Sequence, residues 1–178
     1  MKRLSVVMIV IIALSALLTA CGGGAAAADP VGAVKEAMQS VVDKKFDRLV
    51  ELTCTAKRAE IEKSLNPAEA LGAAGVDANK ILDAMTISLQ NPEYTKISEE
   101  GDKAVVQFKG KMAIKFDLEK FKAVMKEVLA AQGQTVTDEQ LDQGLQMLVG
   151  TFEQGQDLDQ KIEVVKENGK WVYCGEVQ

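Results

Sequence analysis

The sequence contains 178 residues, carries a formal net charge of −5 and lacks histidine altogether. This length suffices for one domain that buries its own core. The acidic balance argues against a nucleic-acid partner, because phosphate binding needs clustered lysine and arginine. The absence of histidine removes the commonest general base and the commonest metal ligand, so we expect no catalysis and no bound metal or cofactor.

Residues 1–20 have the three parts of a secretory signal. Lys2 and Arg3 form the charged start, residues 6–14 form an unbroken apolar core, and small residues precede the cleavage point. The alternatives to a lipoprotein signal are a plain signal peptide and a transmembrane anchor. The apolar run over residues 4–20 is short of the roughly 20 residues that a bilayer needs, and Ser5 and Ser15 interrupt it.

The tetrapeptide Leu-Thr-Ala-Cys at residues 18–21 resembles the lipobox of bacterial lipoproteins. The resemblance implies cleavage between Ala20 and Cys21, and attachment of acyl chains such as palmitate to Cys21. Gly22 stands where an Asp often retains lipoproteins at the inner membrane, so we expect an exported protein held at the outer membrane or on the outer face of the cell membrane. Residues 21–29 then form a loose tether that lets the acyl chains reach the bilayer.

Helices are predicted to open the folded domain, which we expect to cover residues 30–178. Asp29 is a good N-cap and Pro30 suits the first helical position. Apolar residues recur at helical spacing up to residue 42, and residues 43–45 predict a short break. A second helical stretch begins at Phe46 and ends by Pro67, and Asp77 is expected to cap a further short helix.

Strands follow, because the apolar period then changes to two. Residues 87–89 alternate, Asn91–Pro92 predicts a turn, and residues 94–98 predict a short strand. Residues 103–116 alternate strictly, which predicts a sheet with one dry and one wet face and a bend at Gly110. The dry face carries Ala104, Val106, Phe108, Gly110, Met112, Ile114 and Phe116. The wet face carries Lys103, Val105, Gln107, Lys109, Lys111, Ala113 and Lys115.

Residues 117–153 predict two amphipathic helices inserted between strands. Asp117 is expected to cap the first, and Thr137 with Gln140 predicts a capping box for the second. A C-terminal hairpin is expected around Asn168–Gly169, with Val165 opposite Val172 and Val164 opposite Tyr173.

Residues 101–106 (Gly-Asp-Lys-Ala-Val-Val) and 165–171 (Val-Lys-Glu-Asn-Gly-Lys-Trp) resemble small exported lipoproteins of the nuclear transport factor 2-like superfamily. The resemblance covers residues 30–176. It implies an α+β fold in which N-terminal helices pack on a strongly curved antiparallel sheet that forms a cone. The two helices of residues 117–153 depart from that pattern as an insertion before the C-terminal hairpin. The superfamily includes enzymes, carriers and scaffolds, so the fold alone does not specify a function.

The two remaining cysteines form a candidate pair. If Cys21 carries lipid, Cys54 and Cys174 are left as an even pair in an oxidising compartment, which favours a disulfide. The alternative is two buried free thiols. A catalytic thiol is not expected, since no histidine is present to activate it.

Several charged groups have two interpretations. Lys103, Lys109, Lys111 and Lys115 suit either an anionic ligand or lipid headgroup, or the solvated face of a strand. Two acidic groups are weak candidates for calcium and more typical of solvated helix ends and loops: Glu153, Asp157 and Asp159, and Asp138, Glu139 and Asp142. An acid–base site inside a cone would draw on Tyr94, Tyr173 and Glu163, although Glu163 is expected on the face opposite Tyr173.

The sequence therefore favours a lipid-anchored, non-enzymatic module of the bacterial cell envelope. We expect it to contact the membrane through acyl chains on Cys21 and to bind an apolar small molecule, a lipid or an envelope protein. The helical pair of residues 117–153 would cover the sheet, close a pocket or contact a partner helix. The alternatives are a structural lipoprotein without a ligand and a pocket enzyme that uses tyrosine and glutamate.

Overall fold

A computed structural model describes residues 27–65 and 77–177. The predicted signal sequence, Cys21, the tether up to residue 26 and the helix end at Pro67 lie outside the described residues. Four antiparallel strands form one open sheet in the order β1-β2-β3-β4, and helices precede and interrupt them. The elements are α2 (Pro30–Val42), α3 (Phe46–Glu51), α4 (Thr55–Ser64), α6 (Ala78–Asp83), β1 (Met85–Glu100), β2 (Lys103–Phe116), α7 (Leu118–Ala131), α8 (Asp138–Glu153), β3 (Gln156–Glu167) and β4 (Lys170–Glu176).

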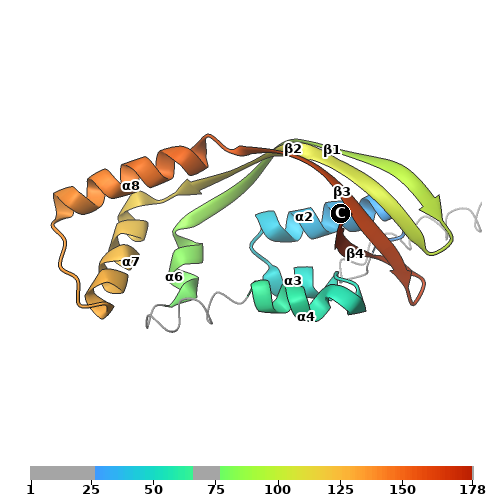
Figure 1. Cartoon of the computed structure of the whole chain (residues 1–178), viewed down its shortest axis with the longest axis horizontal. Coiled ribbons are helices and arrows are strands. Elements are labelled where there is room, and N and C mark those ends of the chain that lie inside the picture. Colours follow the sequence, from blue (N-terminus) through green and yellow to red (C-terminus); the bar gives the residue numbers. More distant parts are fainter. Residues whose placement is uncertain (1–26, 66–76, 178) are drawn as a thin grey trace, which may run out of the picture.

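The sheet is curved, and its two ends hold different helices. Figure 1 shows it arching over α2 at one end and running down to α6, α7 and α8 at the other. The predicted α+β class is confirmed, with helices packed on a curved antiparallel sheet. The predicted two-helix insertion is also confirmed, because α7 and α8 lie between β2 and β3.

Helix α2 lies under the sheet and begins where the sequence predicts. The Asp29 carboxylate accepts a hydrogen bond from the Gly32 amide at 2.9 Å, and Pro30 occupies the first turn. The buried face of α2 packs against strand residues to form the first core. That core consists of Ala33, Val34, Ala104, Val106, Phe108, Ile162, Val164 and Trp171. The predicted dry face is therefore correct for the first half of β2.

The second core lies at the far end of the sheet. It contains Ala84, Phe121, Leu141 and Leu145, with Phe116 at the end of β2 packed against it. Local signals start both long helices there: the Asp117 carboxylate accepts from the Lys120 amide at 3.2 Å, and Thr137 and Gln140 form the predicted capping box. The two cores have no residue in common.

The predicted turn at Asn91–Pro92 is wrong. Strand β1 is continuous, and these two residues form a bulge between Gln90, which pairs with Lys111, and Glu93, which pairs with Lys109. Asn91 adopts a φ of 47°, a left-handed conformation that Asn tolerates better than most residues. The bulge lies opposite Gly110, where the sequence predicts a bend, and such insertions bend and twist a strand.

The predicted wet face of β2 is wrong at one position. Ala113 is only 1% exposed. Gly155, which follows α8, packs so closely that a Cβ atom added there would lie 3.1 Å from the Ala113 Cβ. This contact joins segments 42 residues apart, so the alternation of β2 alone does not reveal it.

The predicted second helical stretch is interrupted between α3 and α4. Residues 52–54 leave the helix to run along β4, where the Tyr173 amide donates to the Leu52 carbonyl at 2.9 Å and the Cys54 amide donates to the Tyr173 carbonyl at 2.7 Å. Cys54 and Cys174 form a disulfide, with Cα atoms 5.1 Å apart. The helical layer is thus joined to the last strand by both backbone pairing and a covalent bond.

The C-terminal hairpin has the predicted register. Val165 pairs with Val172 and Val164 with Tyr173. Asn168 and Gly169 have φ values of 53° and 79°, as the two central residues of a type I′ turn require.

Candidate functional site

An apolar hollow of about 400 Å³ lies between the two cores. Its walls come from the second half of β2, the end of α8 and the start of β3. The lining residues are Met112, Ile114, Phe152, Gly155, Gln156 and Leu158. None of these side chains is ionisable, so the hollow offers apolar contact and one amide rather than acid–base chemistry.

Strand alternation explains why β2 contributes apolar side chains here. Met112 and Ile114 lie directly opposite Leu89 and Ile87 of β1, so all four share one face of the sheet. Met112, Ile114 and Leu89 are half-buried, in contrast to Phe108, which is 0% exposed in the first core. This part of the sheet is therefore apolar without being fully covered.

Phe152 forms the wall of the hollow next to the second core. Phe152 is 42% exposed, and its ring meets the ring of Phe116 edge to face, with centroids 5.8 Å apart. Phe116 in turn lies 4.6 Å, between ring centroids, from Phe121. On the opposite wall, Leu158 packs against the first core. The hollow is therefore bounded by side chains that both cores hold in place.

Gly155 sets the close approach of α8 to β2 beside the hollow. Its φ of +71° is left-handed, and an added Cβ would lie 2.9 Å from the Lys111 Cε and 3.0 Å from the Met112 carbonyl oxygen. Only glycine combines that backbone conformation with that spacing at no steric cost. No motif in the sequence connects Gly155 to Met112, which lies 43 residues earlier in the chain.

The predicted lysine stripe is partly neutralised by acidic residues of β3. The Lys103 ammonium lies 3.5 Å from the Glu163 carboxylate, and the Lys109 ammonium lies 3.3 Å from that of Asp159. The Gln107 amide and, to a smaller extent, Lys109 hold the pKa of Asp159 below its ordinary value. Two of the four lysines thus have cross-strand carboxylate partners.

The predicted acidic groups do not converge on a common point. Asp138 pairs with Lys126 at 2.6 Å, and Asp142 pairs with Lys122 at 2.7 Å, so both carboxylates tie α8 to α7. The hydrogen bond from Lys126 is the main cause of a lowered pKa at Asp138. Within residues 27–65 and 77–177, no three histidine, cysteine, aspartate or glutamate side chains form a cluster suited to a metal ion.

Tyr94 and Tyr173 do not meet Glu163. Both tyrosines pack against the first core, and burial raises the pKa of each phenol. Glu163 lies between Ile162 and Val164, which are fully buried, so its side chain faces the other side of the sheet. The expected separation of Glu163 from Tyr173 is confirmed.

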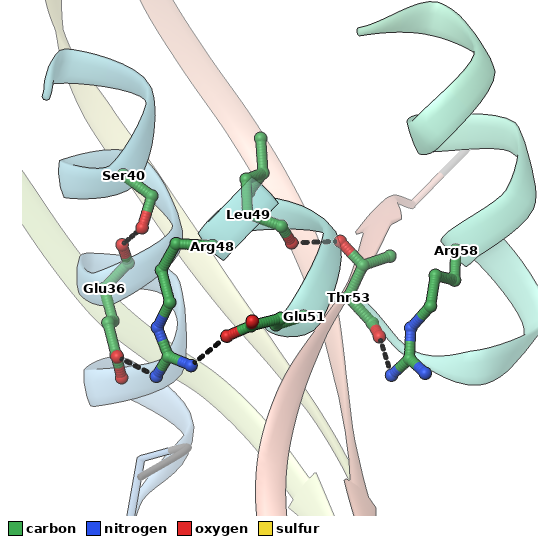
Figure 2. Close-up of polar contacts among 7 residues, drawn as sticks. All are labelled: Glu36, Ser40, Arg48, Leu49, Glu51, Thr53 and Arg58. Atoms are coloured by element: carbon green, nitrogen blue, oxygen red, sulfur yellow. Dashed lines mark hydrogen bonds and ion pairs between the residues drawn. The ribbon is translucent and has the colours of Figure 1, made fainter. Parts of the chain in front are cut away.

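A polar network that the sequence analysis did not identify joins α2, α3 and α4. Figure 2 shows the Arg48 guanidinium between the carboxylates of Glu36 and Glu51, at 2.5 and 2.8 Å. The hydrogen bond to Glu36 is the main cause of a raised pKa at Arg48. In the same view, the buried Thr53 hydroxyl donates to the Leu49 carbonyl at 2.7 Å. The Arg58 guanidinium of α4 donates to the Thr53 carbonyl at 3.0 Å, so Arg48 links α3 to α2 and Arg58 links α4 to the residues just after α3. No sequence motif marks these contacts.

Comparison with known proteins leaves the function open. No protein-family model and no curated protein matches the chain. Among solved structures, it is similar to a SEC-C motif containing protein from Rhodopseudomonas palustris, with a TM-score of 0.41 and 13% identity over 85% of this chain and 80% of that one. In the described part of the chain, no helix is both long and apolar enough to cross a bilayer.

Proposed function

We propose that this protein is a lipid-anchored module of the bacterial cell envelope that binds an apolar small molecule or lipid without catalysing a reaction. The observation that carries the proposal is the apolar hollow between the two cores. Ligand sites are typically concave, mostly apolar and largely pre-formed, and a volume of about 400 Å³ is within their usual range.

The anchor rests on the sequence at residues 18–21, and the disulfide supports the export that such an anchor requires. A Cys54–Cys174 bond suits an exported protein, because disulfides persist mainly in oxidising compartments. We also propose that the domain is related to the nuclear transport factor 2-like superfamily. The packing of α2 under a curved antiparallel sheet is consistent with that proposal.

The lining of the hollow favours binding over catalysis. Among the described residues that line it, none has an ionisable side chain, and the polar one is Gln156 with its amide. The tyrosines and glutamate that an enzyme would use lie on opposite faces of the sheet. A ligand held by Met112, Ile114, Phe152 and Leu158 would be recognised by shape and apolar surface, at about 25 cal/mol for each Å² removed from water.

Native mass spectrometry and peptide mass spectrometry of the protein, produced from the full-length sequence and extracted from its own membrane in mild detergent, test both parts of the proposal. The N-terminal peptide should begin at Cys21 and carry acyl chains, and the protein should retain a further apolar compound. Phe152→Glu should lose that compound. Ile97→Glu is the matched control, because Ile97 is a similarly exposed apolar residue, at 48%, outside the lining of the hollow.

Two results would contradict the proposal separately. An unmodified Cys21 would contradict the proposed lipid anchor without bearing on the proposed binding site. The hollow would be excluded as the binding site if wild type, Phe152→Glu and Ile97→Glu all retained the compound equally. It would also be excluded if none of them retained it. Circular dichroism of each variant distinguishes loss of the site from loss of the fold.

A further inference from the structure

We propose that the open edge of β1, together with the adjoining side of α2, is a docking site for an extended segment of a partner protein that carries an acidic side chain. This surface is separate from the apolar hollow. No residue lines both, since the second site is lined by Gly32, Lys35, Glu36, Gln39, Pro92 and Tyr94.

The two edges of the sheet differ in whether other segments of the chain pair with them. Along β4, Ala27 forms an antiparallel bridge with Trp171, and Thr53 forms a parallel bridge with Tyr173. Along β1, no described residue pairs with the outer edge, because the strand order begins there. An edge strand presents unpaired N–H and C=O groups, which are the groups that another extended backbone recognises.

A hollow of about 680 Å³ lies beside this open edge, between α2 and β1. Successive side chains of an added strand would point alternately to its two faces, so every second one would enter the hollow. An edge strand with a helix beside it therefore supplies both parts of strand-addition recognition. The backbone of β1 would hold the segment, and the hollow would select its side chains.

The charges around the hollow select an acidic side chain. The Glu36 carboxylate is already bound by Arg48, as Figure 2 shows. Lys35 is exposed, and its ammonium lies 5.6 Å from the centroid of the Tyr94 ring. Lys35 makes no ion pair with any residue of the described ranges. Because Arg48 neutralises Glu36, the Lys35 ammonium is the charge of this hollow that can pair with a ligand, and it favours an acidic one.

The irregularities of β1 favour a short partner segment over a second copy of this chain. Register shifts between Gln90 and Glu93 and between Lys96 and Ser98 divide β1 into three regular stretches, and the middle one, Glu93 to Lys96, is the stretch that adjoins the hollow at Tyr94. Pairing two copies of β1 along their length would bring both bulges of each strand into the new ladder, and bulges disrupt pairing. A short segment that pairs along Glu93 to Lys96 meets neither bulge.

A library of random eight-residue peptides, displayed on phage and selected on the immobilised full chain, tests the proposal. Selected peptides should share an acidic residue flanked by β-branched residues. Lys35→Glu should weaken their binding at least tenfold. Lys63→Glu, an equal charge reversal at an exposed site on α4, should leave binding unchanged.

Synthetic copies of a selected peptide then test the backbone contribution. N-methylation of alternate amides removes the donors on one edge of the peptide strand, so one of the two methylated series should bind at least tenfold more weakly than the other. The proposal is overturned if no acidic consensus emerges, if Lys35→Glu binds the peptides as wild type does, or if both methylated series bind equally well. A wild-type dimer whose formation blocks peptide binding would assign the edge to a second copy and also overturn it.

Discussion

Breaking the Cys54–Cys174 disulfide tests how the helical layer is held to the sheet. The bond spans a sequence separation of 120 residues. In the chain-entropy model, a cross-link over a loop of that size destabilises the unfolded state by about 5 kcal/mol. In the folded state, the hydrogen bonds from Cys54 to Tyr173 and from Tyr173 to Leu52 keep the two segments in register without the bond. We therefore expect the reduced protein to stay folded with lower stability.

The expected loss in the free energy of unfolding is on the order of 3–5 kcal/mol. For a chain of this length, such a loss lowers Tm by roughly 6–20 °C. The assay is thermal unfolding followed by circular dichroism, with and without dithiothreitol, on wild type and on a Cys54→Ala/Cys174→Ala double variant. Because Cys54 is only 1% exposed, the variant leaves a small void and should melt slightly below reduced wild type.

The double variant controls for the reagent, since dithiothreitol should not change its Tm. Alkylation of both thiols in the reduced wild-type sample shows that the bond has been broken. A fully reduced wild-type protein with the same Tm as the oxidised protein would refute the reasoning, because it would mean that the cross-link does not restrict the unfolded chain.

Three further predictions follow from single contacts. Phe108→Ala should lower the free energy of unfolding by about 3–5 kcal/mol in urea titrations, since Phe108 is 0% exposed in the first core; a loss below about 1 kcal/mol would contradict the packing. Gly155→Ala should lower the free energy of unfolding by about 1–3 kcal/mol, because Gly155 has a left-handed backbone and close contacts. Gly144→Ala, on an open side of α8, should raise it by about 0.5–1 kcal/mol. Equal effects of the two substitutions would argue against strain at Gly155. Lys126 lowers the pKa of Asp138, so the Asp138 carboxylate contributes stability that is present above about pH 4 and lost as the pH falls through the lowered pKa. Asp138→Asn should therefore flatten this part of the curve of unfolding free energy against pH. An unchanged curve would contradict the ion pair.

Local signals account for most of what the sequence predicts correctly. The caps at Asp29, Asp117 and Thr137 each involve residues within one helical turn, and the turn at Asn168–Gly169 depends on two residues alone. Such features need no information from elsewhere in the chain, so they can be placed without knowledge of the fold.

The errors occur where distant segments meet. Residues 52–54 have a helical pattern, but they leave the helix because β4 supplies hydrogen bonds to them. Asn91–Pro92 has the composition of a turn, yet it forms a bulge because β2 continues to pair with β1 on both sides of it. In each case tertiary pairing outweighs a local preference that would otherwise be followed.

The candidate hollow was beyond sequence reasoning for the same reason. Met112 and Phe152 are 40 residues apart, and α7 and α8 must fold back on the sheet before the two can line one space. The apolar pattern of each segment predicts that it is buried, without specifying its neighbour. Arg48 likewise has no sequence signature, since Glu36 belongs to the preceding helix.

The separation of the two cores has a consequence for how the molecule opens. The disulfide joins Cys54, the residue before α4, to β4, on the side of the first core, and the second core has no covalent cross-link among the described residues. Local unfolding takes place in cooperative units, and the unit with the smaller core and fewer constraints opens at the lower free energy. Amides of α7 and α8 should therefore exchange with solvent long before those of the β2–β3 ladder. The far end of the sheet could then melt and re-form repeatedly while the disulfide-bonded end remains folded.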